Sequence, residues 1–221
     1  MIRTRHAPYE VLPRHQHAHG FAAVVLAGCY SEAGDTGRHR LEPGDVLVHR
    51  AYESHIDRFE STGADVLVIP LAQPWTGPMV GRVGDAHNLM RVADRDPLEA
   101  AAALSGTIVA RASEPHDWPD LLARALHADS ALALGPWAAE RGLHPGSLSR
   151  GFRQVFGVTP ARFRLVARTH RAIRALRETR TALGDIAYAC GFADQAHLTR
   201  AVRAMCAMSP SGVRAAGWTR G

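Results

Sequence analysis

Short runs of apolar residues, separated by turn-forming residues, dominate the first seventy positions of the chain. The clearest runs are FAAVVLAG (21–28), DVLVHR (45–50) and ADVLVIPL (64–71), and glycine-containing turns such as EPGD (42–45) lie between them. Apolar runs of this length that are bounded by turn residues are typical of β-strands. We therefore expect residues 1–75 to form an antiparallel sandwich or barrel.

Two amphipathic helices are predicted after an irregular stretch at 72–95. The first begins at Asp96-Pro97, where a capping residue precedes a proline at the first helical position. Its apolar stripe would consist of Leu98, Ala101, Ala102, Ile108 and Val109. The second follows Pro119 and places Leu121, Leu122, Ala125 and Leu126 on one face. We expect residues 76–130 to be a connecting segment whose helices either cap the barrel core or form the seam of a homodimer.

From Leu132 the pattern is helical almost to the end, and it repeats once. Segments 134–160 and 183–210 share the same order: a short helix, a turn with glycine, a longer helix with arginines, and a Thr-Pro or Ser-Pro stop. Two helices joined in this way are typical of a helix-turn-helix unit, in which the second helix enters the major groove of DNA. The fold class expected is two domains, an all-β barrel followed by an all-α domain with two helix-turn-helix units over 131–221.

Charge is distributed unevenly between the two halves of the chain. The formal charge is +5, but residues 131–221 hold fourteen arginines and four acidic residues, whereas residues 1–130 hold twelve arginines and seventeen acidic residues. A basic half of this kind indicates a polyanionic partner, and double-stranded DNA is the commonest one. Every cation is an arginine, which suits phosphates and guanine edges, although the arginine bias of a GC-rich genome would give the same composition.

The sequence offers no sign of a membrane segment. No apolar run approaches the roughly eighteen residues of a membrane-spanning helix, and the start, MIRTRHAPYE, lacks the apolar stretch of a signal peptide. We expect a cytoplasmic protein with no membrane partner. Cys29, Cys190 and Cys206 show no CxxC spacing, so buried reduced thiols are expected rather than disulfides or a thiolate zinc site.

The second helix of each repeat carries the candidate DNA contacts. The apolar residues expected to form the cores of the two units are Leu134, Trp137, Ala138, Leu143, Leu148, Phe152 and Phe156, then Ile186, Ala187, Phe192, Leu198 and Val202. The residues expected to face outward are Gly146, Ser149, Arg150 and Arg153 in the first unit and Gln195, Ala196, His197, Thr199, Arg200 and Arg203 in the second. Arginine and glutamine pair bidentately with guanine and adenine, so base reading is expected from Arg150, Gln195 and Arg200. Arg153 and Arg203 are better candidates for phosphate contacts.

Two segments, LSRGFRQVFGVTPARF (148–163) and DIAYACGFADQAHLTRAV (185–202), resemble the AraC/XylS family of bacterial transcription regulators. The resemblance covers about ninety residues. It implies that the two recognition helices of one chain enter successive major grooves, with contacts from all ten positions named above except Arg153 and Arg203. The chain departs from the family at Val202 and Cys206, where aromatic residues are usual, and at Ala207, where glycine is usual. The second unit is therefore expected to be less tightly packed than the first.

Histidines are concentrated in the amino-terminal half. Seven of the thirteen lie in the first 55 residues, and His15-Gln-His17-Ala-His19 places alternate imidazoles on one face of a strand. The set resembles the cupin motif, with His15, His17 and Gly28 in register and His55 in the second motif, but Phe21 stands at the glutamate position and Phe59 at the closing position. We expect His15, His17 and His55, with His19 or water, to bind zinc, nickel, copper or iron, or else to line a pocket for an organic effector.

These features favour a sequence-specific DNA-binding transcription regulator that responds to a small molecule or a metal in a cupin-like sensor. A homodimer, and RNA polymerase if the protein is an activator, are the further partners expected. The alternative is a metal-dependent cupin enzyme fused to a DNA-binding domain. We expect no enzyme, because the sequence shows no acid–base pair, nucleophile triad or phosphate-binding loop.

Overall fold

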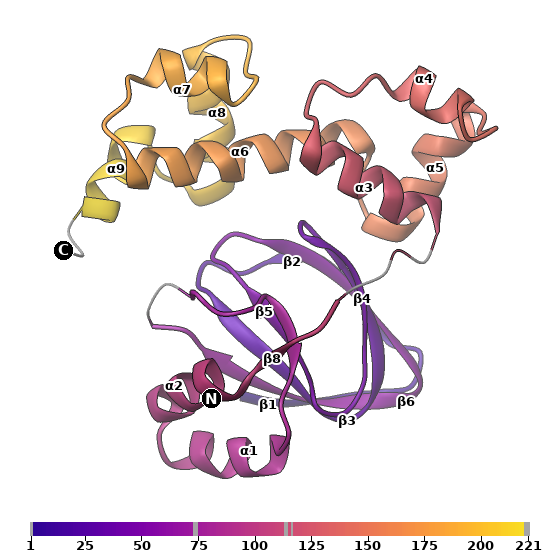
Figure 1. Ribbon diagram of the computed structural model, residues 1–221, viewed down its shortest axis with the longest axis vertical. Coiled ribbons are helices and arrows are strands. Elements are labelled where there is room, and N and C mark those ends of the chain that lie inside the picture. Colours follow the sequence, from indigo (N-terminus) through magenta and orange to yellow (C-terminus); the bar gives the residue numbers. More distant parts are fainter. Residues whose placement is uncertain (1, 73–74, 113–114, 116, 219–221) are drawn as a thin grey trace. The chain divides into compact units, whose positions relative to one another are not determined.

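The chain folds into a sheet-based amino-terminal unit and a helical carboxy-terminal unit (Figure 1), Met1–His116 and Asp117–Gly221. A computed structural model describes residues 2–72, 75–112, 115 and 117–218. The observed division differs from the expected three segments, because the segment 76–130 is not a separate connector. Its first helices pack on the sheet, and its last helix packs within the helical unit. Pro74, in the stretch expected to be irregular, lies outside the described residues.

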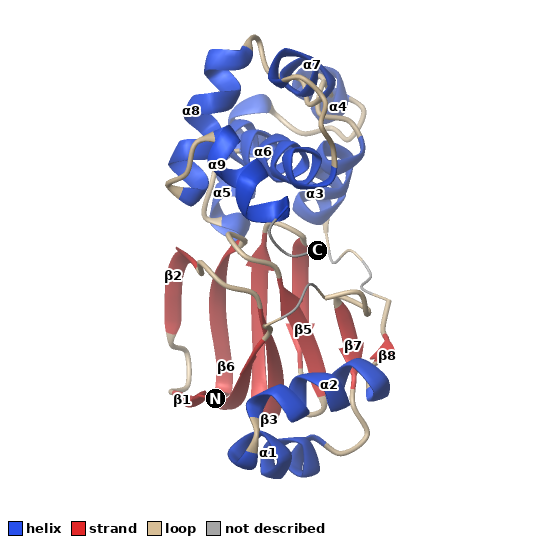
Figure 2. Ribbon diagram, turned by 90° about the vertical axis from the view of Figure 1, so that its left-hand side faces the viewer, coloured by secondary structure: helices blue, strands red, loops and turns tan. Residues whose placement is uncertain are grey.

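Figure 2 shows the sheet of the amino-terminal unit, which contains eight strands within the described residues. The strands are β1 (Ile2–His6), β2 (Val11–Gln16), β3 (Phe21–Gly34), β4 (Gly37–Leu41), β5 (Asp45–His49), β6 (Ser54–Pro70), β7 (Val80–Arg82) and β8 (Val109–Ala110). Their order is β1-β6-β3-β5-β7-β8, while β2 pairs with β6 and β4 with β3. The three apolar runs at 21–28, 45–50 and 64–71 are thus confirmed as strands. Among the described residues, however, these pairings leave β1 and β8 as open edges, so the closed barrel that was expected is not observed.

The two longest strands, β3 and β6, curl by means of bulges. Their register shifts between Val25 and Ala27 and again between Gly28 and Tyr30. Gly28 and Gly63 both have positive φ values, and a Cβ atom at Gly28 would lie 2.0 Å from the carbonyl oxygen of Gly63. Only glycine permits this backbone approach. Because bulges bend and twist a strand, each long strand changes partners along its length: β6 pairs first with β2 and then with β1.

Helices α1 (Ala86–Arg95) and α2 (Pro97–Thr107) cover one face of this sheet. Leu89 and Ala93 of α1, together with Ala100 and Leu104 of α2, are buried in one core with alternate residues of β3, β5 and β6. The Asp96 cap is confirmed, since its carboxylate accepts hydrogen bonds from the backbone of Leu98 and Glu99. The expectation of an irregular stretch at 72–95 was wrong, because β7 and α1 lie in it.

The apolar stripe proposed for α2 was only partly correct, although Ala101 and Ile108 do pack against the sheet core. Leu98 is 60% exposed and Val109 lies in strand β8 and is 69% exposed, whereas Ala100 and Leu104 are buried. Contact with the sheet core has therefore buried the face with Ala100 and Leu104 and left Leu98 exposed. Since the buried face of α2 is used within the chain, this helix caps the sheet.

In the described part of the helical unit, α3 (Trp118–Ala128) is followed by α4 (Leu134–Ala139), α5 (Pro145–Phe156), α6 (Pro160–Glu178), α7 (Leu183–Ala189), α8 (Gln195–Cys206) and α9 (Pro210–Trp218). Figure 1 shows α6 running between an α4–α5 pair and an α7–α8 pair. Phe152, Phe156 and Phe163 form the centre of the first pair, with ring centroids 4.6 to 5.3 Å apart. Nearly all the predicted core residues are buried; Leu134 and Leu143 are half-buried.

Candidate functional site

The two helix pairs of the helical unit repeat each other in detail. The turn of the first pair has Gly142 at φ 64° and a hydrogen bond from the amide of Leu143 to the carbonyl of Ala138. The turn of the second has Gly191 at φ 78° and the same bond from Phe192 to Ala187. A left-handed glycine at each turn re-aims the chain so that the second helix can cross the first. The repeat expected from the sequence is therefore confirmed as two helix-turn-helix units.

The longer helices, α5 and α8, end in the same way. Gly157 and Ala207 both adopt the left-handed conformation, and their amides donate to the carbonyls of Arg153 and Arg203, respectively. Left-handed C-caps are usually glycine, because a Cβ atom is strained there. Arg150 and Arg153 of α5 thus have Arg200 and Arg203 as their structural counterparts in α8.

Most of the ten predicted contact residues are exposed on these two helices. Gly146, Ser149, Arg150, Arg153, Gln195, Ala196, Arg200 and Arg203 are exposed, and Thr199 is half-buried. His197 departs from the expectation, because it is half-buried and its ring packs 5.2 Å from the ring of Phe192. The imidazole of His197 therefore contributes to the packing of the second unit as well as to its surface.

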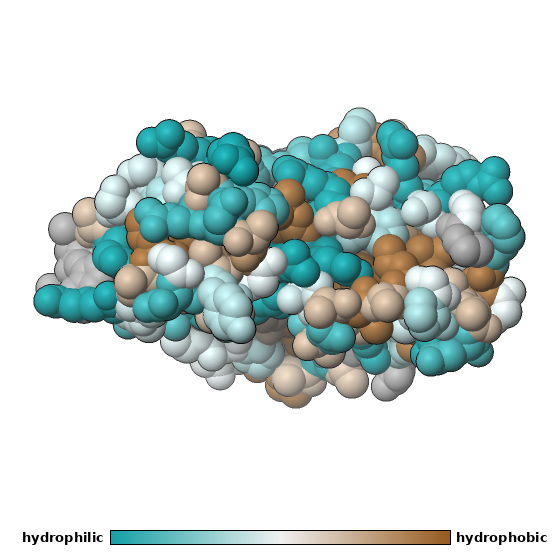
Figure 3. Space-filling view, turned by 90° about the horizontal axis from the view of Figure 1, so that it is seen from above, coloured by the Kyte–Doolittle hydropathy of each residue, from teal (hydrophilic) through white to brown (hydrophobic). Residues whose placement is uncertain are grey.

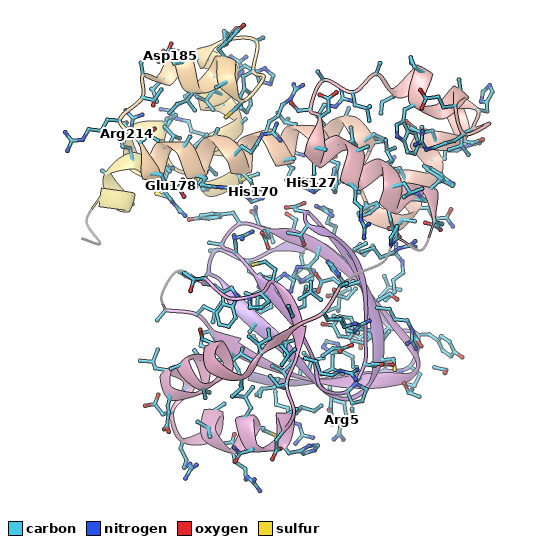
Figure 4. All side chains as sticks on the ribbon, viewed as in Figure 1. Arg5, His127, His170, Glu178, Asp185 and Arg214 are labelled. Carbon is cyan, nitrogen blue, oxygen red and sulfur yellow. The ribbon has the colours of Figure 1, made fainter. Side chains whose placement is uncertain are left out.

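Two groups of arginines in the helical unit differ in their contacts. Arg164 and Arg168 of α6 donate to the carbonyls of Leu132 and Ser130, at 2.6 and 2.5 Å, and so hold the segment between α3 and α4 against α6. A further arginine, Arg214 of α9 (labelled in Figure 4), donates to the carbonyl of Thr181 at 2.5 Å. These guanidinium groups are structural.

The arginines of the recognition helices form the second group. Arg150, Arg153, Arg200 and Arg203 are exposed and form no hydrogen bond or ion pair with other described residues. Figure 3 shows how widely hydrophilic side chains cover the visible face of the helical unit, with apolar patches between them. Since a guanidinium group has five donors that need acceptors, these four side chains are available to phosphates and base edges.

A histidine cluster lies on the other face of the sheet, the face that also buries Leu47 and Phe59. Cross-strand pairing aligns His15 of β2 with His55 of β6, and the ring of His15 lies 4.3 Å from that of His55 and 4.9 Å from that of His17. One ligand atom from each of the three residues lies within 4.8 Å of the other two. The structure therefore brings His15, His17 and His55 together as expected, whereas His19 is exposed and lies outside the group.

Glu32 and His49 belong to the same cluster, and the sequence analysis missed both. Glu32, His49 and His55 form a second group of potential ligands, all buried, whose ligand atoms also lie within 4.8 Å of one another. Pairing of β3 with β6 sets Gly34 opposite His55, and pairing with β5 sets Phe21 opposite His49. Because alternate residues of a strand lie on the same face, Glu32 lies on the same face of β3 as Gly34, which is paired with His55. This argument could have placed the Glu32 carboxylate beside the histidines, but it requires that the strand register is already known.

Burial and mutual charge set the protonation of this cluster. Burial would raise the pKa of Glu32, but His49 and His55 outweigh it and lower that pKa to about 2. Burial lowers the pKa of His55 to about 3. At His49 burial also acts to lower the pKa, but the charge and hydrogen bonding of Glu32, together with other nearby carboxylates, outweigh it and raise the pKa. Burial, with the charge of Glu32, raises the pKa of Asp57 to about 8. Near neutral pH the cluster therefore combines an ionised Glu32 with a neutral His55.

The helical unit has the arrangement of a DNA-binding domain with two helix-turn-helix units. Residues 137–216 match the family described as "Helix-turn-helix domain". The chain is also 37% identical over 68 residues to the HTH-type transcriptional activator RhaS of Escherichia coli O139:H28 (strain E24377A / ETEC), a match that covers 31% of this chain and 24% of that protein. Over these residues the chain is similar to AraC/XylS-type regulators, which agrees with the resemblance found in the sequence.

Two solved structures are similar to parts or all of the chain. A transcriptional regulator with an AraC-type DNA-binding domain from Chromobacterium violaceum is 26% identical, with a TM-score of 0.42 over 45% of this chain and 91% of that one. ToxT from Vibrio cholerae is 10% identical, with a TM-score of 0.42 over 95% of each chain. Within the described part of this chain, none of the helices has the length and apolar character needed to cross a membrane.

Proposed function

We propose that this protein is a sequence-specific DNA-binding transcription regulator whose sheet-based unit is a cupin-like sensor. The observation that carries the proposal is the equivalence of α5 and α8: each follows the same turn, ends at the same left-handed cap and presents exposed, unpaired arginines at matching positions. The 19-residue helix α6 separates the two units. The two helices suit two successive major grooves of one DNA duplex.

Base reading rests mainly on Arg150, Gln195 and Arg200 in this proposal. Gly146 and Ala196 lack side chains that form hydrogen bonds, so they contribute by letting the backbone approach the DNA. Replacing Arg150 or Arg200 by alanine should weaken binding to the preferred DNA sequence by about 1–3 kcal/mol, or about 5- to 150-fold, and relax base preference at the contacted position. Replacing Arg153 or Arg203 should weaken binding to all sequences. Each replacement should also reduce by about one the slope of the logarithm of the binding constant against the logarithm of the salt concentration.

The experiment starts by selecting preferred DNA sites from a random duplex library with the full chain. Fluorescence anisotropy then measures the affinity of each variant for the selected site and for a scrambled duplex at several salt concentrations. Arg91→Ala is the matched control, since Arg91 is an exposed arginine of α1 in the other unit. Unchanged affinity and base preference in both Arg150→Ala and Arg200→Ala would refute the assignment.

The histidine cluster is the proposed effector site. It gathers imidazoles from β2, β5 and β6 with the carboxylate of Glu32 from β3, and Figure 4 shows side chains filling the space within the curved sheet. Occupancy can regulate transcription only if the effector has different affinities for two states of the protein. DNA affinity should therefore change when the effector binds, and identical affinities with and without it would remove the sensor role.

A homodimer remains part of the proposal, but the structure leaves little apolar surface for it on the helices first considered. Leu104 of α2 and Leu126 of α3 are fully buried within their own units. Leu98 and Leu121 are the large apolar side chains that these two helices expose, at 60% and 42%. Sedimentation of wild type against the double variant Leu98→Gln/Leu121→Gln tests these two helices, and an unchanged dimer would exclude both of them.

A further inference from the structure

The buried end of the histidine cluster differs from its rim. His15 and His17, at the rim, are half-buried, whereas the side chains of Glu32, His49 and His55 are at most 5% exposed. The rim residues belong to the cupin-like motif found in the sequence. Glu32 and His49 lie outside that motif, and the glutamate position of the motif is occupied by Phe21.

Several polar atoms at the buried end lack hydrogen-bond partners among the described residues. They are His49 Nε2, His55 Nδ1 and, beside them, Asp57 Oδ1. A buried polar group without a partner costs about 1–3 kcal/mol, so native proteins seldom leave several of them together unless a water molecule or an ion completes the site. The two unpartnered nitrogens lie on either side of the same carboxylate.

The distances at this carboxylate fit coordination better than direct hydrogen bonding. Glu32 Oε2 lies 3.4 Å from His49 Nε2, and Glu32 Oε1 lies 3.9 Å from His55 Nδ1. Ligand atoms that each lie about 2.0–2.2 Å from one tetrahedral ion are about 3.4 Å apart. The glycine at position 34 leaves room for this arrangement, because a Cβ atom there would lie 3.3 Å from the Cβ of His55 and 3.4 Å from Glu32 Oε1.

We propose that Glu32, His49 and His55 bind one divalent transition-metal ion, such as zinc or ferrous iron, at an inner site beneath the rim histidines His15 and His17. Two imidazoles and one carboxylate are the donor set that these ions accept. Three protein ligands leave a further coordination position for water or for a donor atom of an effector. Any effect of the metal on DNA binding rests on the proposed function, whereas metal binding itself does not.

The rim histidines have a defined place in this arrangement. His15 Nδ1 lies 2.9 Å from the carbonyl oxygen of Pro13, and a carbonyl can only accept, so this nitrogen carries the proton. In the neutral imidazole, Nε2 of His15 then keeps its lone pair. The rim can therefore supply an additional ligand or guide the ion inward, but the inner three residues are sufficient to hold it.

The test measures metal binding by the full chain, in the absence of DNA. Protein stripped with a chelator is titrated with Zn²⁺, and the bound metal is measured by elemental mass spectrometry. A parallel titration uses Co²⁺, whose visible absorption reports nitrogen and oxygen ligands directly. The inner variants are Glu32→Gln and His49→Gln, the rim variant is His15→Gln/His17→Gln, and His87→Gln is the control because His87 is an exposed histidine of α1.

We expect one ion per chain in the wild type and in His87→Gln. Each inner variant should lose affinity by more than the roughly 10- to 100-fold typical of residues that only support a ligand. Retention of the ion in the rim variant supports an inner site directly. Loss in both the inner and the rim variants also supports Glu32 and His49 as ligands, with the rim completing the same site.

Two results would overturn the proposal: no ion bound by the wild type, or an ion lost from the rim variant but retained by both inner variants. Circular dichroism checks that each variant is folded. Should Glu32→Gln fail to fold, Glu32→Asp keeps the carboxylate, and we expect it to bind the ion with reduced affinity and a shifted Co²⁺ spectrum. DNA affinity measured on the same samples separates the two proposals, because a chain that binds metal but no DNA contradicts only the regulator function.

Discussion

The contact between α3 and α5 predicts how the free energy of unfolding changes when a glycine at the contact is replaced by alanine. Gly151 lies in the middle of α5, where a glycine normally destabilises a helix by about 1 kcal/mol relative to alanine. A Cβ atom at Gly151 would lie 2.5 Å from Cζ2 and 3.0 Å from Cη2 of the Trp118 indole. Since carbon atoms in favourable contact are about 3.5–4.0 Å apart, Gly151→Ala would force the indole or the helix to move.

The net effect follows from two opposing terms. Overpacking of this kind costs about 1–3 kcal/mol, and the gain in helix propensity offsets about 1 kcal/mol of it. We therefore expect Gly151→Ala to lower the free energy of unfolding of the helical unit by up to about 2 kcal/mol. For a unit of about 100 residues, each kcal/mol changes Tm by about 4–8 °C.

Gly184→Ala provides the matched control within the same unit. Gly184 lies in α7, and a Cβ atom there would meet no other atom within 4 Å. This variant should gain up to about 1 kcal/mol, so the two alanine variants should shift Tm in opposite directions. Calorimetry of the full chain resolves the transition of the helical unit. If Gly151→Ala proves as stable as Gly184→Ala, the close packing of α3 on α5 is refuted.

Three further variants test other parts of the structure. Ala207→Gly should raise the free energy of unfolding by about 1 kcal/mol in urea denaturation, because Ala207 has φ 57°; a loss of stability would contradict the left-handed cap. Phe152→Ala should cost about 3–5 kcal/mol and abolish DNA binding through unfolding, because Phe152 is fully buried and stacks on Phe156. Hydrogen bonds from Arg5 and a second arginine lower the pKa of Asp65 to about 2 in the folded protein. The ionised carboxylate therefore contributes to the free energy of unfolding above its unfolded pKa of about 3.9, and this contribution is lost as the pH falls through 2. Asp65→Asn should thus lower the free energy of unfolding by less than about 1 kcal/mol at pH 7, because the partner side chains are exposed. In urea titrations the difference in free energy of unfolding between variant and wild type should become smaller below pH 4. A difference that grows with acidity would refute this expectation.

The sequence alone was enough to define the two helix-turn-helix units, because their signals are local. Apolar spacing, a glycine at each turn and a proline after each long helix act within a few residues, so the two repeats could be aligned without any knowledge of the tertiary structure. The same holds for the three apolar strands. His15, His17 and His55 were also brought together correctly, because a recognisable motif recorded their spacing.

The remaining features depend on contacts between residues that are distant in the chain. Glu32 and His49 join the cluster because β3 pairs with both β5 and β6, and a shift of one residue in that register would turn either side chain to the opposite face. Helix α3 belongs to the helical unit because the Trp118 indole packs over Gly151, a fit that neither segment signals by itself. Helix periodicity predicted α2, but contact with the sheet core determined that Ala100 and Leu104, and not Leu98, are buried. Local preferences act through neighbouring residues, whereas register and burial are set by surfaces that exist only once the chain has folded.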